Sequence, residues 1–279
     1  MTPLAELIAD SAVDGVYAVA RKERLRTRAG AAYLALELSD ESGRVEARVW
    51  NDVDLLDARF SEGDAVRALG RVESFRDKLQ IQVRTLEPAP EADPTTLAPA
   101  GRRDPDELEG FLDFLVAEIA HEPLRATVTA LLGDGEGRRR LRTLPATVEG
   151  HHSYSGGLLE HTVGVATICR DLCQVHPRLR SDLLLGAALV HDLGRTLELG
   201  PAPVFAPTPE GRLLGHVQLG LRLIEQHAGS LAPELRAELL HAVAAHHDVR
   251  SAHTAEAAAL YHANQLDTVA QLRPVDSDR

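Results

Sequence analysis

The stretch from Leu183 to Arg195 constrains the fold of this chain more than any other. It begins with an almost wholly apolar helical run and ends in the pair His191-Asp192, followed by Gly194. A helix that is apolar on every side belongs in the centre of a helical domain. An imidazole and a carboxylate at its end need a compensating partner, because burying an unpaired charge is costly. A divalent metal ion is the simplest candidate, since His and Asp are good ligands for the harder transition metals.

A single His-Asp pair is weak support for a metal site, so the other histidines decide the matter. Twelve of the thirteen histidines follow residue 150. His161, His216, His246 and Asp267 each share a helical face with apolar residues three, four or seven positions away, which turns them toward the core. One inward histidine is usually a satisfied core residue. Four helices that each send a His or Asp inward indicate a metal centre.

Composition narrows the class of protein. The 279 residues suffice for two domains, and the net charge of -12 argues against a generic polyanion-coating protein while leaving a local basic groove open. Cys169 and Cys173 are one helical turn apart, which suits two buried thiols and a reducing compartment. The sequence has no apolar run long enough to span a bilayer, so we expect a cytoplasmic protein without a membrane partner.

The first 88 residues have the pattern of a small barrel. Alternating apolar residues predict strands at 13–20, 31–38, 45–50, 65–72 and 79–86, with a short helix at 53–60. This order is expected of an OB-fold, although an unrelated small barrel could share it. A proline-rich linker follows at 89–105, and helical periodicity begins with a helix at 106–121. We therefore predict a multidomain α and β protein, with an all-β OB-fold barrel at 1–88 and an all-α helical bundle at 106–279.

A basic run at 21–28 and several aromatic residues in the barrel suggest nucleic-acid binding. Single-stranded nucleic acid is held by a positive groove with stacking rings. Tyr33 and Trp50 are the best candidates for base stacking, and Arg26 and Arg28 for phosphate contacts. The alternative is that the aromatics fill the barrel core and that the basic run is a solvated loop.

The order His161, His191-Asp192, His216, His246-His247 and Asp267 resembles the HD-domain metal-dependent phosphohydrolases. The amino-acid sequences of four segments resemble those of one branch, the YhaM-type 3′→5′ exoribonucleases. These segments are HHSYSGGLLEHT at 151–162, LVHDLG at 189–194, EGRLLGH at 210–216 and His246-His247. That branch also carries an OB-fold before its HD domain, so the resemblance covers most of the chain.

The resemblance implies a set of metal ligands. His161, His191, Asp192 and Asp267 would surround one ion, whereas His216, His246 and His247 would hold a second, with Asp192 bridging. Two such ions suit phosphodiester hydrolysis, because they activate water and neutralise charge on the phosphoryl oxygens. The ligand types favour manganese, iron, cobalt or nickel, and the family favours manganese, with one or two ions bound.

The resemblance also implies roles for residues beside the ligands. Asp192, Arg195 and His152 are the predicted catalytic residues. His151 and Tyr154, like His152, would be substrate-contacting or supporting residues, with helix capping or packing as the alternative for the histidines.

Three departures from the family pattern bear on activity. Arg195 stands where the family usually has Lys, and it keeps the positive charge but cannot donate a proton as Lys can. Asp248 follows the histidine pair where Gly is common. The Asp267 carboxylate is retained in an altered segment, Asn264-Gln-Leu-Asp267. None of the implied ligands is missing, so an active enzyme is expected.

The leading hypothesis is a metal-dependent 3′→5′ exoribonuclease that acts on single-stranded RNA, with single-stranded DNA left open as a second substrate and a homo-oligomer left open as the assembly. The alternative from the same chemistry is an HD-type phosphohydrolase of small or cyclic nucleotides. A nucleic-acid-binding protein with a structural metal is the non-enzymatic alternative. Since ligand histidines must be neutral to bind metal, activity is expected to fall below about pH 6.

Overall fold

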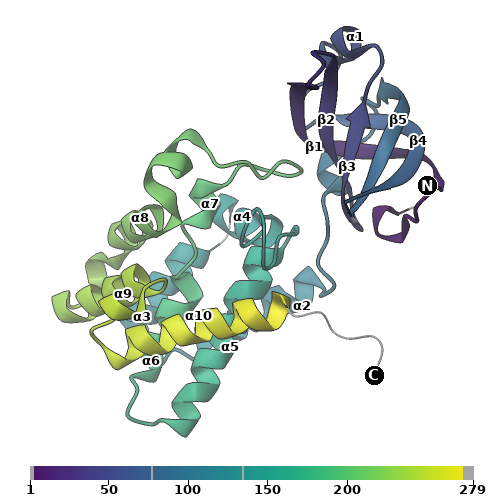
Figure 1. Cartoon of the computed structure of the whole chain (residues 1–279). Helices are drawn as coiled ribbons and strands as arrows, with labels where there is room; N and C mark the ends of the chain where they lie inside the picture. Colours follow the sequence, from purple (N-terminus) through teal and green to yellow (C-terminus); the bar gives the residue numbers. More distant parts are fainter. Residues whose placement is uncertain (1–2, 77, 134, 273–279) are drawn as a thin grey trace, which may run out of the picture. The chain divides into compact units, whose positions relative to one another are not determined.

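The chain forms two compact units in the computed structural model, which describes residues 3–76, 78–133 and 135–272 (Figure 1). The first unit comprises Met1–Ala100 together with Pro201–Phe205, and the second comprises Gly101–Gly200 and Ala206–Arg279. Within the described ranges, no helix is both long enough and apolar enough to cross a membrane.

The first unit is a closed five-stranded barrel. Its strands are β1 (Ala12–Arg26), β2 (Ala32–Asp40), β3 (Gly43–Val49), β4 (Ala65–Phe75) and β5 (Lys78–Pro88). They follow one another around the barrel in the order β1-β2-β3-β5-β4, and β3 and β5 are the parallel neighbours. The short helix α1 (Val53–Asp57) lies between β3 and β4 in the chain. The predicted OB-fold barrel is therefore confirmed.

Strand β1 is longer than the sequence pattern predicts. It was expected over 13–20 but continues to Arg26, because its first half pairs with β4 and its second half pairs with β2 as far as Arg26 and Ala32. The interpretation of the basic run as a loop is therefore wrong up to Arg26, since ladder pairing with β2 keeps polar residues in the strand. Two of the barrel aromatics, Tyr17 and Phe60, are buried in the core.

The second unit is all α-helical. Its main helices are α2 (Pro105–Ala117), α3 (Glu122–Leu132), α4 (Glu136–Thr143), α5 (Gly157–Val175), α6 (Ser181–Val190), α7 (Arg195–Glu198), α8 (Pro209–His227), α9 (Pro233–Ala245) and α10 (Ala255–Leu272). Every residue of α6 from Leu183 onward is buried, and α3, α5, α9 and α10 contact it. This confirms the expected apolar helix at the centre of a helical domain.

A cluster of arginines on α4 holds the helices together instead of forming a basic surface. Arg138 and Arg142 both pair with Glu109 of α2. Arg140 donates to the carbonyl oxygens of Thr196 and Leu199 at the end of α7. These three guanidinium groups have internal partners, so they do not form a basic surface for nucleic acid.

Candidate functional site

The seven implied ligands come from five helices or their ends and meet in the helical unit. His161 lies on α5, Asp267 on α10 and His216 on α8, whereas His191-Asp192 follows α6 and His246-His247 follows α9. Together with His152 they form three overlapping groups, in each of which the possible ligand atoms lie within 4.8 Å of one another. The groups are His161, His191 and Asp192; Asp192, His216, His246 and His247; and His152, His161 and Asp267.

The first group is fully buried. Nε2 of His161 and Nε2 of His191 lie 3.2 Å apart, and each is 3.9 Å from Oδ2 of Asp192. The other ring nitrogen of His191 contacts the carbonyl oxygen of Ala188 at 2.8 Å, and a carbonyl can only accept. In the neutral ring, Nδ1 of His191 therefore carries the hydrogen and Nε2 presents a lone pair to the centre.

Asp267 contacts the side of His161 that faces away from Asp192. Its Oδ2 lies 2.7 Å from Nδ1 of His161 and 2.9 Å from Nε2 of His152. Burial would raise the pKa of Asp267, but the hydrogen bonds from His152 and His161 outweigh it and hold the pKa well below its usual range. In this arrangement Asp267 orients His161, and its implied role as a direct ligand stays a prediction.

A chain of polar contacts continues outward from Asp267. Nδ1 of His152 lies 2.7 Å from the hydroxyl of Tyr154, which donates to Oε2 of Glu160 at 2.8 Å. His152 is buried, and it is connected to His161 through Asp267, which both rings contact. Glu160 is not among the residues predicted from the sequence, although its place directly before His161 in the first turn of α5 is a usable signal.

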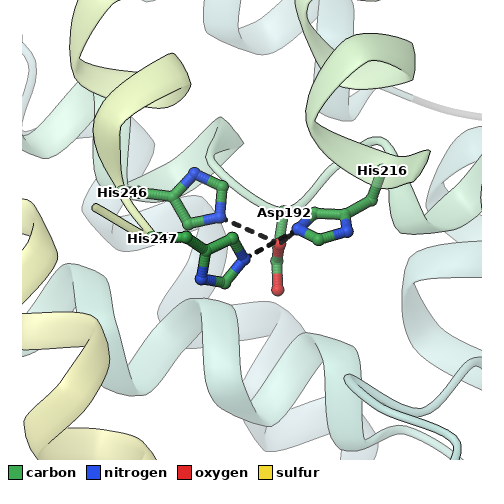
Figure 2. Close-up of side chains that lie close together, drawn as sticks. All are labelled: Asp192, His216, His246 and His247. Carbon is green, nitrogen blue, oxygen red and sulfur yellow. Dashed lines mark hydrogen bonds and ion pairs between the residues drawn. The ribbon is translucent and has the colours of Figure 1, made fainter. Parts of the chain in front are cut away.

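The second group surrounds the other oxygen of Asp192, as Figure 2 shows. Oδ1 of Asp192 lies 3.3 Å from Nε2 of His216 and 3.5 Å from Nε2 of His246. Nε2 of His247 lies 2.8 Å from Nε2 of His216. His246 is buried, whereas His247 is exposed, so this group lies nearer the solvent than the first. Asp192 is the residue that the two groups share.

The side chains fit divalent cations. Nδ1 of His161 faces Asp267 and Nδ1 of His191 faces Ala188, so each ring, when its hydrogen is on Nδ1, turns an Nε2 lone pair toward the other at 3.2 Å. Oδ1 of Asp192 and Nε2 of His246 are buried and have no hydrogen-bond partner among the described residues. Such atoms are costly to bury alone, and a cation between them would satisfy all of them.

Burial also tunes the charge of the ligands. It lowers the pKa of His191 to about 3. For the more exposed His247, partial burial and the neighbouring His246 lower the pKa to about 4, so both rings are neutral at pH 7. Burial would raise the pKa of Asp192, but the charge of Arg195 and the neighbouring imidazoles hold it well below its usual range. His191 and His247 are therefore neutral and Asp192 is ionised, which is the protonation state that a metal requires of these three ligands.

Arg195 is bound between two carboxylates. Its Nε lies 3.6 Å from Oδ2 of Asp192, and its Nη1 donates to Oε2 of Glu198 at 2.8 Å. The guanidinium of Arg195 is directed inward, toward Asp192 and Glu198. Whether it also acts on substrate, as the family resemblance implies, stays a prediction. A second departure from the family pattern, Asp248, caps its own loop by accepting the N–H of Arg250 at 3.0 Å.

The residues predicted to bind nucleic acid lie on the barrel. The rings of Tyr33 and Trp50 stack with centroids 4.7 Å apart and planes at 26°, and 41% of Trp50 is exposed. Arg26 at the end of β1 and Arg28 in the following turn are exposed, and Arg26 donates to the carbonyl oxygen of Gly30. Their contact with nucleic acid stays a prediction, for which the exposed ring of Trp50, stacked on the half-buried Tyr33, is suitable.

Comparison with known proteins connects both units to characterised families. The HD domain family model matches residues 158–269, and a model described as an OB-fold nucleic acid binding domain matches residues 18–89. A protein of Shouchella clausii named 3′-5′ exoribonuclease YhaM is 30% identical over 241 residues, which cover 85% of this chain and 75% of that protein. A protein of the same name from Oceanobacillus iheyensis is 27% identical over 243 residues, with coverage of 84% and 75%.

Proposed function

Because this chain belongs to the family of YhaM-type 3′→5′ exoribonucleases, we propose that it is a divalent-metal-dependent exonuclease that shortens single-stranded RNA from the 3′ end. The observation that carries this proposal is the sharing of Asp192 between two groups of histidines, one buried and one that reaches from the buried His246 to the exposed His247. A carboxylate between two sets of imidazoles is suited to two neighbouring cations, and paired cations are typical of phosphodiester hydrolysis.

The residues divide into two metal subsites. His161 and His191 would hold one ion, with Asp267 as the further ligand that the family resemblance implies. His216, His246 and His247 would hold the other, and Asp192 would be shared by both. When bound, the ions would lower the pKa of water and neutralise charge on the phosphoryl oxygens. We propose manganese, with iron, cobalt and nickel as the alternatives that suit mixed imidazole and carboxylate ligands.

The protein's own contribution is to orient the ligands. Hydrogen bonds to Ala188, Val243 and Asp267 fix the far nitrogens of His191, His246 and His161, respectively. Each Nε2 therefore faces the centre before any ion arrives, which reduces the reorganisation that binding requires. Arg195 keeps a permanent positive charge beside Asp192, and this charge favours the ionised carboxylate.

The barrel supplies the surface for the strand in this proposal. Tyr33 and Trp50 would stack on bases, and Arg26 and Arg28 would contact phosphates. We assign residues 1–88 to strand binding, 89–105 to a linker and 106–279 to hydrolysis. Single-stranded DNA offers the same bases and phosphates and is therefore retained as a second substrate.

A time course on 5′-labelled single-stranded RNA with added Mn²⁺ tests this function. The wild type should give a ladder that shortens stepwise from the 3′ end, and Asp192→Ala should give none and should lose bound metal. Asp171→Ala is the matched control, because Asp171 is an exposed carboxylate paired with Arg170 on α5. An intact oligomer together with hydrolysis of mononucleotides or cyclic nucleotides would instead establish the small-nucleotide phosphohydrolase.

A further inference from the structure

Glu198 contacts two residues of the centre without belonging to any of the ligand groups found in the described residues. Its Oε1 accepts the backbone N–H of His216 at 3.2 Å. Its Oε2 accepts Nη1 of Arg195 at 2.8 Å and lies 3.6 Å from Nδ1 of His216. Only 14% of its side chain is exposed. One carboxylate therefore links two residues that both lie against Asp192.

The N–H of His216 is available because α8 is interrupted just before it. Gly215 has φ 69° and ψ 163°, so the turn that begins at His216 is not continuous with the preceding one. The first N–H groups of a helical segment lack an acceptor within the helix, and a negative charge near them is favourable. Glu198 supplies this acceptor from α7, which fixes the start of the segment that carries His216.

Close backbone packing holds Glu198 in this position. A Cβ atom on Gly211 would lie 2.3 Å from the carbonyl oxygen of Glu198, and one on Gly194 would lie 1.9 Å from the carbonyl oxygen of His216. Such distances require glycine at both positions. The backbone of the His191–Glu198 region therefore rests directly on α8, and the side chain of Glu198 spans this contact.

We propose that Glu198 is a positioning residue for the second metal subsite, an inference that rests on the metal centre proposed above. Its contact with Nδ1 of His216 directs Nε2 toward Oδ1 of Asp192, the geometry shown in Figure 2. Its bond to Arg195 holds the guanidinium beside Oδ2 of Asp192. Loss of the carboxylate should weaken the ion at His216, His246 and His247 and spare the ion at His161 and His191.

The alternative is that Glu198 only ties α7 to α8. A purely stabilising ion pair would lower the unfolding temperature when removed, but it would not weaken one ion more than the other. The separate affinities of the two ions therefore distinguish positioning from stabilisation.

The test is a Mn²⁺ titration of the metal-free full-length protein, with free Mn²⁺ followed by electron paramagnetic resonance. We expect two ions in the wild type. In Glu198→Ala one of the two ions should lose about 10–100-fold in affinity, the range typical of partners behind a metal ligand, and the other ion should be unchanged. Glu198→Gln should be intermediate, because its amide oxygen can still accept the N–H of His216. Glu210→Ala should match the wild type, since Glu210 is an exposed carboxylate paired with Arg222 on α8.

The outcomes separate this inference from the proposed function. The positioning role would be overturned if Glu198→Ala and Glu198→Gln bind both ions with wild-type affinity. It would also be overturned if both ions are weakened equally. A wild type that binds a single ion would refute the two-ion centre and this role with it. A wild type that binds two ions but does not cleave RNA would refute only the exonuclease. If Glu198→Ala does not fold by circular dichroism, the isosteric Glu198→Gln decides the question.

Discussion

Replacing Gly194 with alanine should disable the centre through sterics alone. Gly194 has φ -59° and ψ -20°, which any L-residue adopts without strain. A Cβ atom here would nevertheless lie 1.9 Å from the carbonyl oxygen of His216 and 2.5 Å from the amide nitrogen of Gly220. Real Cβ contacts are not shorter than 3.0 Å, so the oxygen of His216 must move by about 1.1 Å, the difference between 3.0 Å and 1.9 Å.

The size of the effect follows from this displacement. Overpacking of a close contact costs about 1–3 kcal/mol of unfolding free energy. For a domain of this size, each kcal/mol lowers the unfolding temperature by about 2–4 °C. Nε2 of His216 lies only 3.3 Å from Oδ1 of Asp192, and a misplacement near 1 Å in a catalytic site can reduce the rate by about 100-fold. We therefore expect a folded protein with much weaker RNA cleavage.

Thermal unfolding, Mn²⁺ titration and RNA cleavage should be measured on Gly194→Ala beside Gly110→Ala. Gly110 lies within α2, and a Cβ atom there meets nothing within 4 Å in the part of the chain that the structure describes. Alanine should stabilise that helix by about 0.5–1 kcal/mol and leave activity unchanged. Retention of wild-type metal affinity and cleavage by Gly194→Ala would refute the argument that the His216 backbone is fixed by this contact.

Three further predictions use other assays. Trp50→Ala should weaken binding of single-stranded RNA by about 1–3 kcal/mol in fluorescence anisotropy, whereas the exposed barrel residue Phe75 should tolerate alanine, and equal losses would argue against base stacking on Trp50. Because the pKa of His191 falls from 6.5 to about 3 on folding, only the unfolded chain gains this proton between these pH values, and the urea midpoint of the metal-free protein should fall as pH drops from 6.5 toward 3. The lowered pKa of Asp192 adds a further loss of stability below pH 3.8. An unchanged urea midpoint between pH 7 and pH 5 would contradict this prediction. Removal of metal by a chelator should lower the unfolding temperature and Mn²⁺ should restore it, since a ligand of the folded state stabilises that state. An unfolding temperature that changes with neither chelator nor Mn²⁺ would count against a bound metal.

The same pKa values change the expected pH dependence of activity. An ordinary imidazole implies loss of activity below about pH 6. Burial keeps His191 neutral to about pH 3 and His247 to about pH 4, so protons compete for these two rings only at lower pH. Proton competition at these two rings should therefore begin only well below pH 6, which a pH profile of Mn²⁺ binding can test.

The sequence by itself determined the two architectures and the residues that meet at the centre. Periodicity is a local property, so strand alternation predicted the barrel and helical spacing turned His161, His216 and His246 inward. The apolar run before His191 predicted a buried central helix, which α6 confirms. The family resemblance rested on these same segments, and the 30% identity to a YhaM protein confirms it.

Only the tertiary structure decided how those residues contact one another. Asp267 lies against the far nitrogen of His161, a contact that spans 106 positions of the chain, and Glu198 accepts the N–H of His216 across an interrupted helix. The extension of β1 to Arg26 likewise depends on its pairing with β2. Sequence spacing places a side chain on a helical face, but the atom it meets depends on how separate elements pack. Ring orientation, backbone approach at Gly194 and the partners of Arg195 are therefore properties of the assembled fold.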